Sequence, residues 1–509
     1  MKKLIYISLL IAILVVIFMP FQFLLNFAHD DSFFYIKTAS NFSKGLGSTF
    51  DGINHTNGYH PLYFISLVIL FFVPNFLFEA SPEFLYRLDF LYHLVVIVFM
   101  QYYIIKSLKN VFKKDFNSIS VTILIILLSV FIFIRDFGME SHLACLIVSY
   151  FLYLKSIELN TGENKIVVKS LLLALLFLTR TDFISSYIPF ILIIDFFIGY
   201  KKKQYIITSF TILAVTILTY YSINFFFFGS INTVTGKYLN SFPAIAISSN
   251  FDTLFADPAK FYNQFVRILI VFVSFILFVI YYKKIKGTEE IKRKFYLIII
   301  FLGTGGLVFT IIHLLYNKLG IREWYMTLPT FVAIIMIVIL LPKRKDILNI
   351  SLILSFIFFV SIFYGTRIMK LKNVSGYEYA KSLNSIVKEN ERVYQIDFCG
   401  VIGFFSDRNV VNGDGLINSF EYIDYVNKGK IDEYIEKYNI KYYSTYTVVN
   451  LLEDSVYTDR NFSHMVNGKI FRFPASSLIL EKQFKWNHIA FDSDGKWYLF
   501  KFKQGKNIE

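Results

Sequence analysis

Long apolar runs bounded by short basic segments constrain this chain most strongly. The first runs from Leu4 to Leu25, directly after Lys2 and Lys3, and contains no charged residue. A helix of about 20 apolar residues is long enough to cross a bilayer. We expect about eleven such spanning helices along the chain. Because 55% of the residues are hydrophobic, against about 45–50% in a typical soluble domain, the sequence predicts an α-helical polytopic membrane protein.

The basic residues indicate orientation rather than a nucleic-acid partner. The formal net charge is +14, which in a soluble protein would suggest binding to nucleic acid. Here the lysines lie in short segments between apolar runs, the pattern of cytoplasmic loops. We therefore expect no nucleic acid, a multi-pass protein of the cytoplasmic (inner) membrane, and an N-terminus inside. The first run has no small-residue cleavage site, so we expect it to remain as the first span.

The apolar stretch 61–78 is the ambiguous element. If residues 27–83 form one external loop, this stretch must be a helix lying on the outer interface, and its Pro74–Asn75 break fits that role. If it is instead another span, every later loop changes sides and the basic clusters face outward. We favour the interfacial interpretation because it keeps the basic clusters in the cytoplasm.

Composition changes sharply near residue 370. Residues 1–370 are predicted to form the membrane domain, and residues 371–509 an extracytoplasmic α/β domain. In the latter, strand-like runs such as 392–397, 441–449 and 497–502 alternate with a helical run at 430–439. The glycine-rich stretch 400–418 has no GxGxxG at a strand–helix junction, so we expect turns there and no nucleotide site. Cys145 and Cys399 are expected to be neither paired nor redox-active.

Charged residues recur at the helix ends that this topology places outside. An ionisable side chain in a membrane helix is costly, so such a set calls for a function. Both signs are present, unlike in the nearly all-basic cytoplasmic loops. The set comprises Asp30, Asp31, Arg135, Asp136, Glu140, Arg180, Asp182, Lys237, Arg322 and Glu323.

Acidic and basic residues together suit transfer of a phosphate-linked sugar. A carboxylate can take a proton from an attacking hydroxyl or help to bind a divalent cation. Arginine and lysine can hold a phosphate while it leaves. A carboxylate base beside a cationic phosphate site at the membrane rim therefore points to a sugar carried on a lipid phosphate.

Several segments resemble the integral-membrane GT-C glycosyltransferases, in particular bacterial members related to lipid A aminoarabinose transferases, protein O-mannosyltransferases and arabinofuranosyltransferases. These segments are DDSFFYIKTASNFSKGLGSTFDG with TNGYHPLY, then GMES, LTRTD, TGKYLNSF and REWY. The opening block is the most specific. The C-terminal GVIGFFSDRNVVNGDGLINS resembles the domain that many bacterial members carry after their last span.

The resemblance implies a polyprenyl-phosphate sugar donor, an envelope lipid, polysaccharide or protein as acceptor, and transfer with inversion outside the cytoplasmic membrane. An acidic pair in the first external loop acts in that family as base or as metal ligands, which maps to Asp30 and Asp31 with Mg²⁺ or Mn²⁺ as the cation in question. We assign donor phosphate binding to Lys237, Arg322 and Arg180. Substrate or acceptor binding is assigned to His60, Asn57, Glu140 and Tyr325.

Each assignment has a structural alternative. Asp30 or Asp31 could cap a helix, Glu140 could pair with Arg135, and Arg180 could pair with Asp182. Rival functions are a transporter or flippase and a polymerase or ligase of lipid-linked sugars, or a non-enzymatic envelope protein. A transporter would place charges near the middle of the membrane, whereas these lie at one face.

Overall fold

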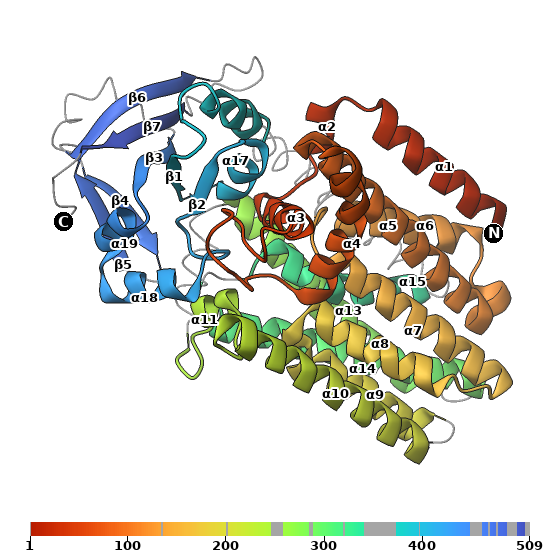
Figure 1. Ribbon diagram of the computed structural model, residues 1–509. Helices are drawn as coiled ribbons and strands as arrows, with labels where there is room; N and C mark the ends of the chain where they lie inside the picture. The colour runs from red at the N-terminus through yellow and green to blue at the C-terminus, as the bar shows by residue number, and fades with distance from the viewer. Residues whose placement is uncertain are drawn as a thin grey trace.

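The structure is a computed structural model of the chain. It describes residues 2–133, 136–199, 202–245, 258–284, 289–318, 321–340, 373–396, 398–447, 461–466, 469–474, 477–485 and 496–503. A bundle of helices occupies one part of the molecule, and a domain built on a β-sheet covers one end of that bundle (Figure 1). We call the described residues from 373 onward the sheet domain.

The helices of the bundle follow the apolar runs of the sequence. They are α1 (Lys2–Phe18), α2 (Phe21–Leu25), α3 (Asp30–Ser43), α4 (Pro61–Phe78), α5 (Pro82–Phe112), α6 (Ser118–Leu128), α7 (Ser141–Thr161), α8 (Ile166–Thr179), α9 (Tyr187–Ile198), α10 (Lys202–Phe228), α11 (Val234–Leu239), α13 (Pro258–Lys284), α14 (Glu290–Tyr316) and α15 (Thr327–Leu340). Short 3₁₀ turns at Thr181–Ser185 and Glu323–Met326 follow α8 and precede α15.

Within the described residues, seven helices are long and apolar enough to cross a membrane, and four shorter apolar helices accompany them. This confirms the polytopic helical fold that the sequence predicts. The exact number of spans stays a prediction, as does the domain boundary near 370, because residues 341–372 lie outside the described part of the chain.

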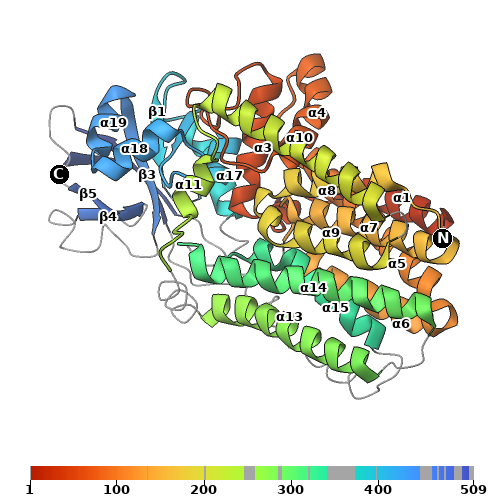
Figure 2. The same cartoon turned by 90° about the horizontal axis from the view of Figure 1, so that it is seen from below.

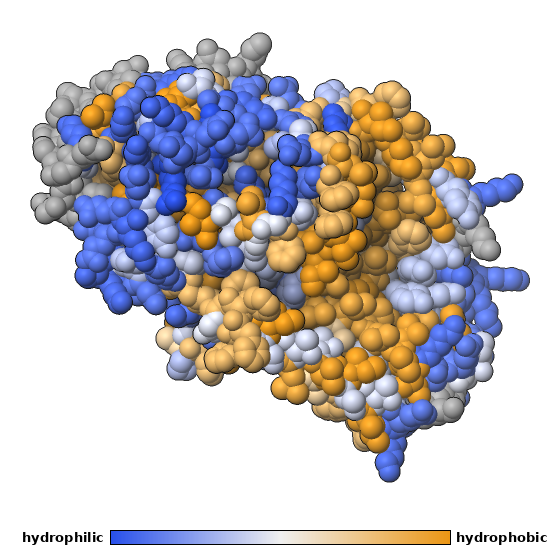
Figure 3. Space-filling view, viewed as in Figure 1, coloured by the Kyte–Doolittle hydropathy of each residue, from blue (hydrophilic) through white to orange (hydrophobic). Residues whose placement is uncertain are grey.

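The outer surface of the bundle has the chemistry of a lipid-facing surface. Phe225, Phe226 and Phe227 on α10 are 57%, 81% and 76% exposed. Orange, apolar residues cover much of the bundle in Figure 3, while the sheet domain is largely blue. A soluble protein rarely leaves so continuous an apolar surface in water. We conclude that a bilayer surrounds the bundle.

Helices α3 and α4 pack against each other and run across the other helices of the bundle (Figure 2). By length and composition α4 could cross a membrane. Its crosswise direction is what the interfacial interpretation requires, and the position of α4 relative to the bilayer stays a prediction.

Two lysines counted as cytoplasmic loop charges are instead buried. Lys155 lies 2.8 Å from Glu158 and 2.7 Å from Asp195, and Lys169 lies 2.8 Å from each of the same carboxylates. All four side chains are at most 1% exposed. The cluster joins α7, α8 and α9 with no net charge, so these two lysines carry no information about orientation.

The sheet domain contains a five-stranded sheet in the order β2-β1-β3-β7-β6 and a β4-β5 hairpin. Its strands are β1 (Arg392–Gln395), β2 (Asn409–Asn412), β3 (Ile440–Thr447), β4 (Asn461–Val466), β5 (Lys469–Pro474), β6 (Leu478–Lys485) and β7 (Lys496–Phe502). Its helices include α17 (Cys399–Phe405), α18 (Phe420–Lys428) and α19 (Ile431–Lys437), and residues 373–383 are also helical. Strand β1 pairs in parallel with β2 and β3, and β7 is antiparallel to β3 and β6. The predicted α/β character is confirmed.

The glycine-rich stretch differs from the prediction. Gly400 and Gly403 lie inside α17, the helix that connects β1 to β2, rather than in turns. Within residues 400–418, all of which the structure describes, only Gly415 has the positive φ, +83°, of a turn glycine. A helix of seven residues is too short to show a clear helical pattern of apolar residues, so the sequence did not reveal it.

Candidate functional site

A cavity of about 400 Å³ lies where the bundle meets the sheet domain. Its walls come from α3, the loop that leads into α4, the segment before α7, the turn after α8, the α10–α11 region, the end of α14, the turn before α15 and Leu416 of the sheet domain. Of the residues predicted to form the site, those that line it are Asp31, His60, Glu140, Arg180, Arg322 and Tyr325. The structure thus brings together side chains that are spread over almost 300 positions of sequence.

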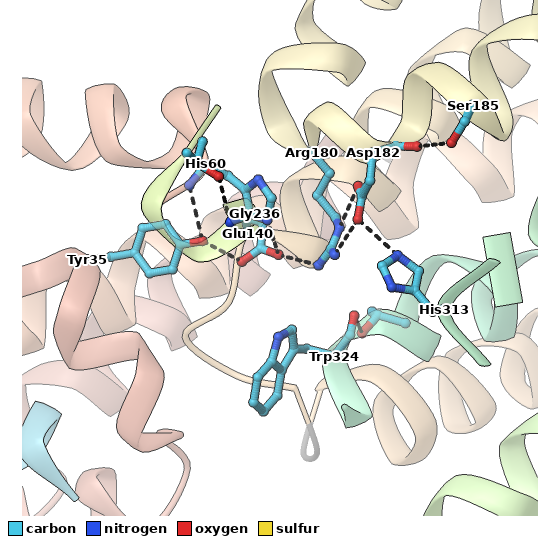
Figure 4. Close-up of polar contacts among 11 residues, drawn as sticks. Tyr35, His60, Glu140, Arg180, Asp182, Ser185, Gly236, His313 and Trp324 are labelled. Carbon is cyan, nitrogen blue, oxygen red and sulfur yellow. Dashed lines mark hydrogen bonds and ion pairs between the residues drawn. The ribbon is translucent and has the colours of Figure 1, made fainter. Parts of the chain in front are cut away.

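A chain of hydrogen bonds crosses the cavity wall (Figure 4). The Tyr35 hydroxyl donates to Glu140 at 3.0 Å, and Arg180 donates to the other Glu140 oxygen at 2.7 Å. Arg180 also donates twice to Asp182, at 3.2 and 2.8 Å, and His313 Nε2 lies 3.0 Å from the same carboxylate. Glu140 and Arg180 are only 1% and 2% exposed. Buried pairs of this kind fix side-chain positions, because breaking them leaves an uncompensated charge.

The charge of Arg180 is therefore already balanced by two carboxylates. Burial alone would raise the pKa of Asp182, but Arg180 and His313 beside it hold that pKa well below its usual value. Asp182 is thus ionised at neutral pH. The pairing of Arg180 with Asp182 is present as the structural alternative supposed, and Glu140 pairs with Arg180. Arg135, the other partner considered for Glu140, lies outside the described residues.

Arg322 differs from Arg180 in its surroundings. It lines the cavity and is only partly exposed, and its side chain has no hydrogen bond or ion pair in the part of the chain that the structure describes. It directly precedes the Glu323–Met326 turn. Its guanidinium is therefore available to an anion in the cavity.

Aromatic side chains form much of the remaining wall. The Arg180 guanidinium lies over the Tyr325 ring, with its Cζ atom 4.4 Å from the ring centroid. Other aromatic residues of the wall are Phe34, Tyr35, Tyr59, Tyr220, Tyr221, Tyr316 and Trp324. Flat aromatic faces offer contact area to a sugar ring, and the cavity combines them with the charged side chains named above.

His60 sits at the entrance to α4 beside this network. Its Nε2 is 3.7 Å from Glu140, and its backbone N–H donates to the Tyr35 hydroxyl at 3.4 Å. Burial lowers the pKa of His60 below its usual value, although the Glu140 carboxylate opposes this shift. A neutral imidazole at neutral pH can donate or accept a hydrogen bond to a ligand in the cavity.

The two adjacent aspartates have different surroundings. Asp31 lines the cavity. Asp30 accepts hydrogen bonds from the backbone N–H groups of Gly400 at 3.1 Å and Val401 at 2.8 Å, in the first turn of α17. The structural alternative, a helix cap, thus holds for Asp30 in an unexpected form, because it meets the N-terminal amides of a helix in another domain.

Gly400 is required for this contact. A Cβ atom there would lie 2.1 Å from the backbone oxygen of Asp30. No side chain fits at that distance, so α17 can approach α3 this closely only with glycine at this position.

Asn57 and Lys237 do not line the cavity. Asn57 is buried and holds the first loop to the α10–α11 region: it donates to Asn224 and to the backbone of Asn232, both at 3.1 Å, and accepts from Val234 N at 2.9 Å. Lys237 is 44% exposed and lies 3.7 Å from Asp424 of α18. Neither position supports the substrate or phosphate contact predicted for it.

A group of potential metal ligands adjoins the cavity through Trp324. His29, Asp136 and Glu323 offer ligand atoms within 4.8 Å of one another, and the His29 ring packs against Trp324 at 5.1 Å. Neither Asp30 nor Asp31 belongs to this group. Both oxygens of Asp136 already accept from Arg267, at 3.2 and 2.9 Å. The arginine balances the carboxylate, so the group fits a divalent cation poorly.

Tyr35, His313 and Arg267 escaped the sequence-based prediction. Tyr35 follows Asp31 by four residues, one helical turn, so both can face the same cavity. His313 and Arg267 are single ionisable residues in long apolar runs, a signal that marks functional or paired groups in membrane helices. That signal could have identified both.

Comparison with known proteins supports the fold. No family model matches the sequence, and no curated protein matches it closely enough to count as a relative. Among solved structures, the chain is similar to the Archaeoglobus fulgidus oligosaccharyltransferase in its apo form, with a TM-score of 0.50 and 11% identity, over 87% of this chain and 69% of that one. At this identity the likeness concerns the fold, and it confirms that this chain has the GT-C-like fold that its sequence resembles.

Proposed function

We propose that the protein is a membrane glycosyltransferase that moves a sugar from a polyprenyl-phosphate donor to an envelope acceptor, at the outer face of the cytoplasmic membrane. The observation that carries the proposal is the cavity at the rim of the bundle. It combines Asp31, the unpartnered Arg322 and an aromatic wall. The GT-C-like fold and the lipid-facing surface of the bundle agree with a substrate that arrives through the membrane.

The reaction needs few groups. The oxygen of an acceptor hydroxyl attacks the anomeric carbon opposite the phosphate, and the bond from that carbon to the phosphate oxygen breaks. The phosphate leaves with the electron pair, and the hydroxyl proton passes to a carboxylate. Attack from the opposite face inverts the configuration at the anomeric carbon.

Asp31 is the proposed base, because it is the member of the acidic pair that lines the cavity. Arg322 is the proposed phosphate contact, because a cation without a partner can stabilise the charge that develops on the leaving group. Arg180, Glu140 and Asp182 position the wall rather than bind phosphate. Because Arg267 already neutralises Asp136 in the group nearest to a metal site, we derive no step through a metal.

The position of the charges favours this function over transport. The charged network of Glu140, Arg180 and Asp182 lies at the end of the bundle that adjoins the sheet domain. The buried cluster of Lys155 and Lys169 lies at the opposite ends of α7 and α8. A flippase would be expected to place binding charges between these ends.

The test is mass spectrometry of envelope lipids, glycans and glycoproteins from strains that express equal amounts of protein. The strains are a deletion, a wild-type complement, Asp31→Asn, and the surface control Asp424→Asn. We expect one sugar unit to vanish in the deletion and to return with wild type and Asp424→Asn, but not with Asp31→Asn. Full restoration by Asp31→Asn would refute the proposed base, and an unchanged glycan profile in the deletion would refute the proposed activity.

A further inference from the structure

A second cavity, of about 230 Å³, adjoins a different face of α3 from the first cavity. Lys37, Ser40 and Asn41 of α3 line the second cavity, whereas Asp31 lines the first. The second cavity is bounded by α3 and the loop after it, by the junction of α4 and α5, and by the segment that joins α17 to β2. It is separate from the first cavity, since no residue lines both. It therefore has no part in the chemistry proposed above.

Two cations in this cavity lack partners. The ammonium groups of Lys37 and Lys44 have no hydrogen bond or ion pair in the described part of the chain. Burial, followed by the charge of Lys44, lowers the pKa of Lys37 to about 8, and Asp407 and Asp51 oppose this shift. An anion in the cavity would offset both unfavourable effects.

The other charged groups of the cavity are already committed. Asp51 accepts from the backbone N–H groups of Ile53 and Asn54 in its own loop, at 2.9 and 2.8 Å. Asp407 accepts from the Asn384 side chain at 2.9 Å. These carboxylates are turned to their own partners and do not bridge to either lysine.

Arg408 is committed in the same way. It donates to the backbone oxygens of Val387, Asn384 and Asp407. The charge that remains available to a ligand is therefore that of Lys37 and Lys44.

A buried hydroxyl gives an independent indication of a ligand. Ser406 is 1% exposed and lines the cavity, and its Oγ has no hydrogen-bond partner among the described residues. A buried polar atom without a partner costs about 1–3 kcal/mol. Native proteins rarely retain such an atom unless a water or ligand satisfies it.

We propose that this cavity binds a phosphate group through Lys37, Lys44 and the hydroxyl of Ser406. Two ammonium groups and one hydroxyl supply donors for the oxygens of a phosphate, while Asp51 and Asp407 are hydrogen-bonded elsewhere. The cavity lies beside Ala80, Pro82 and Leu85, where α4 ends and α5 begins. Phe78 and Phe84 next to it are 56% and 39% exposed. The phosphate can thus belong to a lipid headgroup or be free in solution.

The experiment measures binding to the purified full-length protein in detergent by titration calorimetry. The three probes are inorganic phosphate, a short-chain phosphatidylglycerol and the corresponding diacylglycerol without phosphate. The variants are the double variant Lys37→Ala with Lys44→Ala, the single variants Lys37→Arg and Ser406→Ala, and the surface control Lys428→Ala. Thermal unfolding of every variant shows whether it is folded.

We expect one saturable site for a phosphate-bearing probe. The double variant should bind about 100-fold more weakly, since it loses two charge-assisted contacts and each is worth about a factor of ten. Ser406→Ala should weaken binding less, whereas Lys37→Arg and Lys428→Ala should stay close to wild type. The affinity for the phosphodiester lipid should fall as the pH rises through about 8, where Lys37 loses its proton.

The two sources of phosphate are distinguished by the probes. Binding of inorganic phosphate shows that the phosphate group alone suffices, and binding of the lipid alone shows a headgroup site. Equal binding of diacylglycerol and phosphatidylglycerol, no saturable site for either phosphate probe, or an unchanged affinity in the folded double variant would overturn the proposal. None of these outcomes depends on glycosyl transfer.

Discussion

Replacing each aspartate of the Asp30–Asp31 pair separately should give two different defects. Asp30 accepts two hydrogen bonds at the N-terminus of α17, at 3.1 and 2.8 Å. Bonds to a charged acceptor contribute about 1.5–3 kcal/mol each and neutral ones about 0.5–1.5. Asparagine keeps one acceptor atom, loses the charge and turns an NH₂ group toward one of the N–H donors. We therefore expect Asp30→Asn to weaken the contact between α3 and α17 by about 2 kcal/mol.

The assay is hydrogen exchange of the purified protein, followed by mass spectrometry on peptides that cover α17. A loss of about 2 kcal/mol raises the opening equilibrium roughly 30-fold, so these amides should exchange about that much faster. Gly400→Ala should produce at least the same effect while keeping both carboxylates, because its Cβ would lie 2.1 Å from the Asp30 oxygen. Asp31→Asn should leave the exchange of α17 unchanged and should abolish sugar transfer.

One result would refute this reasoning. If Asp30→Asn leaves the exchange of α17 at the wild-type rate and abolishes transfer as fully as Asp31→Asn, then Asp30 acts in the chemistry and its contact with α17 contributes nothing. A partial loss of transfer together with fast exchange would instead show that docking of the sheet domain supports the cavity.

Three further predictions concern the charged groups. Arg322→Met should lower kcat/KM for sugar transfer at least about 100-fold by removing a charge contact to the leaving phosphate. Lys237→Met removes a charge outside the cavity and should change kcat/KM less than about threefold in the same assay. Asp182→Asn should lower the thermal unfolding temperature at neutral pH. Because the pKa of Asp182 is held well below its usual value, the difference in unfolding temperature from wild type should persist down to about pH 4 and shrink below it. A difference that vanishes near neutral pH would contradict this pH dependence. Lys155→Met should destabilise the bundle by about 3–5 kcal/mol, because it leaves Glu158 and Asp195 with one lysine between them. Combining it with Asp195→Leu should recover much of that loss. Equal loss in the single and double variants in a denaturation assay would show that the pairing has no role.

The sequence was most informative where chemistry and periodicity agree. Apolar runs without charges predict helices because no other chain segment satisfies its backbone in a bilayer, and the helices lie where those runs are. Charged residues at helix ends on one side of the membrane should meet, because helices that cross the same membrane bring their ends to the same level. On this ground the sequence predicted that Asp31, Glu140, Arg180 and Arg322 lie together. The strand runs near 392, 441 and 497 were likewise identifiable from alternating apolar residues.

The sequence was least informative about partners. Charge alone does not show whether Arg180 faces a ligand or two carboxylates, since that depends on how α7 and α8 pack. The same holds for Lys155 and Lys169, which look like loop charges beside an apolar run. In the structure both lysines lie 2.8 Å from Glu158. Lys155 shares α7 with Glu158, but Lys169 lies on α8, so the sequence alone does not reveal the second contact.

The Asp30–Asp31 pair shows this limit at a single helix. Successive residues of an α-helix differ in direction by about 100°, so two adjacent aspartates at its start must face different neighbours. A sequence resemblance that covers both residues cannot tell which one faces the cavity. The answer depends on Gly400, some 370 positions later, because it is the close approach of α17 that occupies Asp30 and leaves Asp31 to the cavity. Catalytic pairs at helix starts should therefore be assigned only when the element that covers the helix is known.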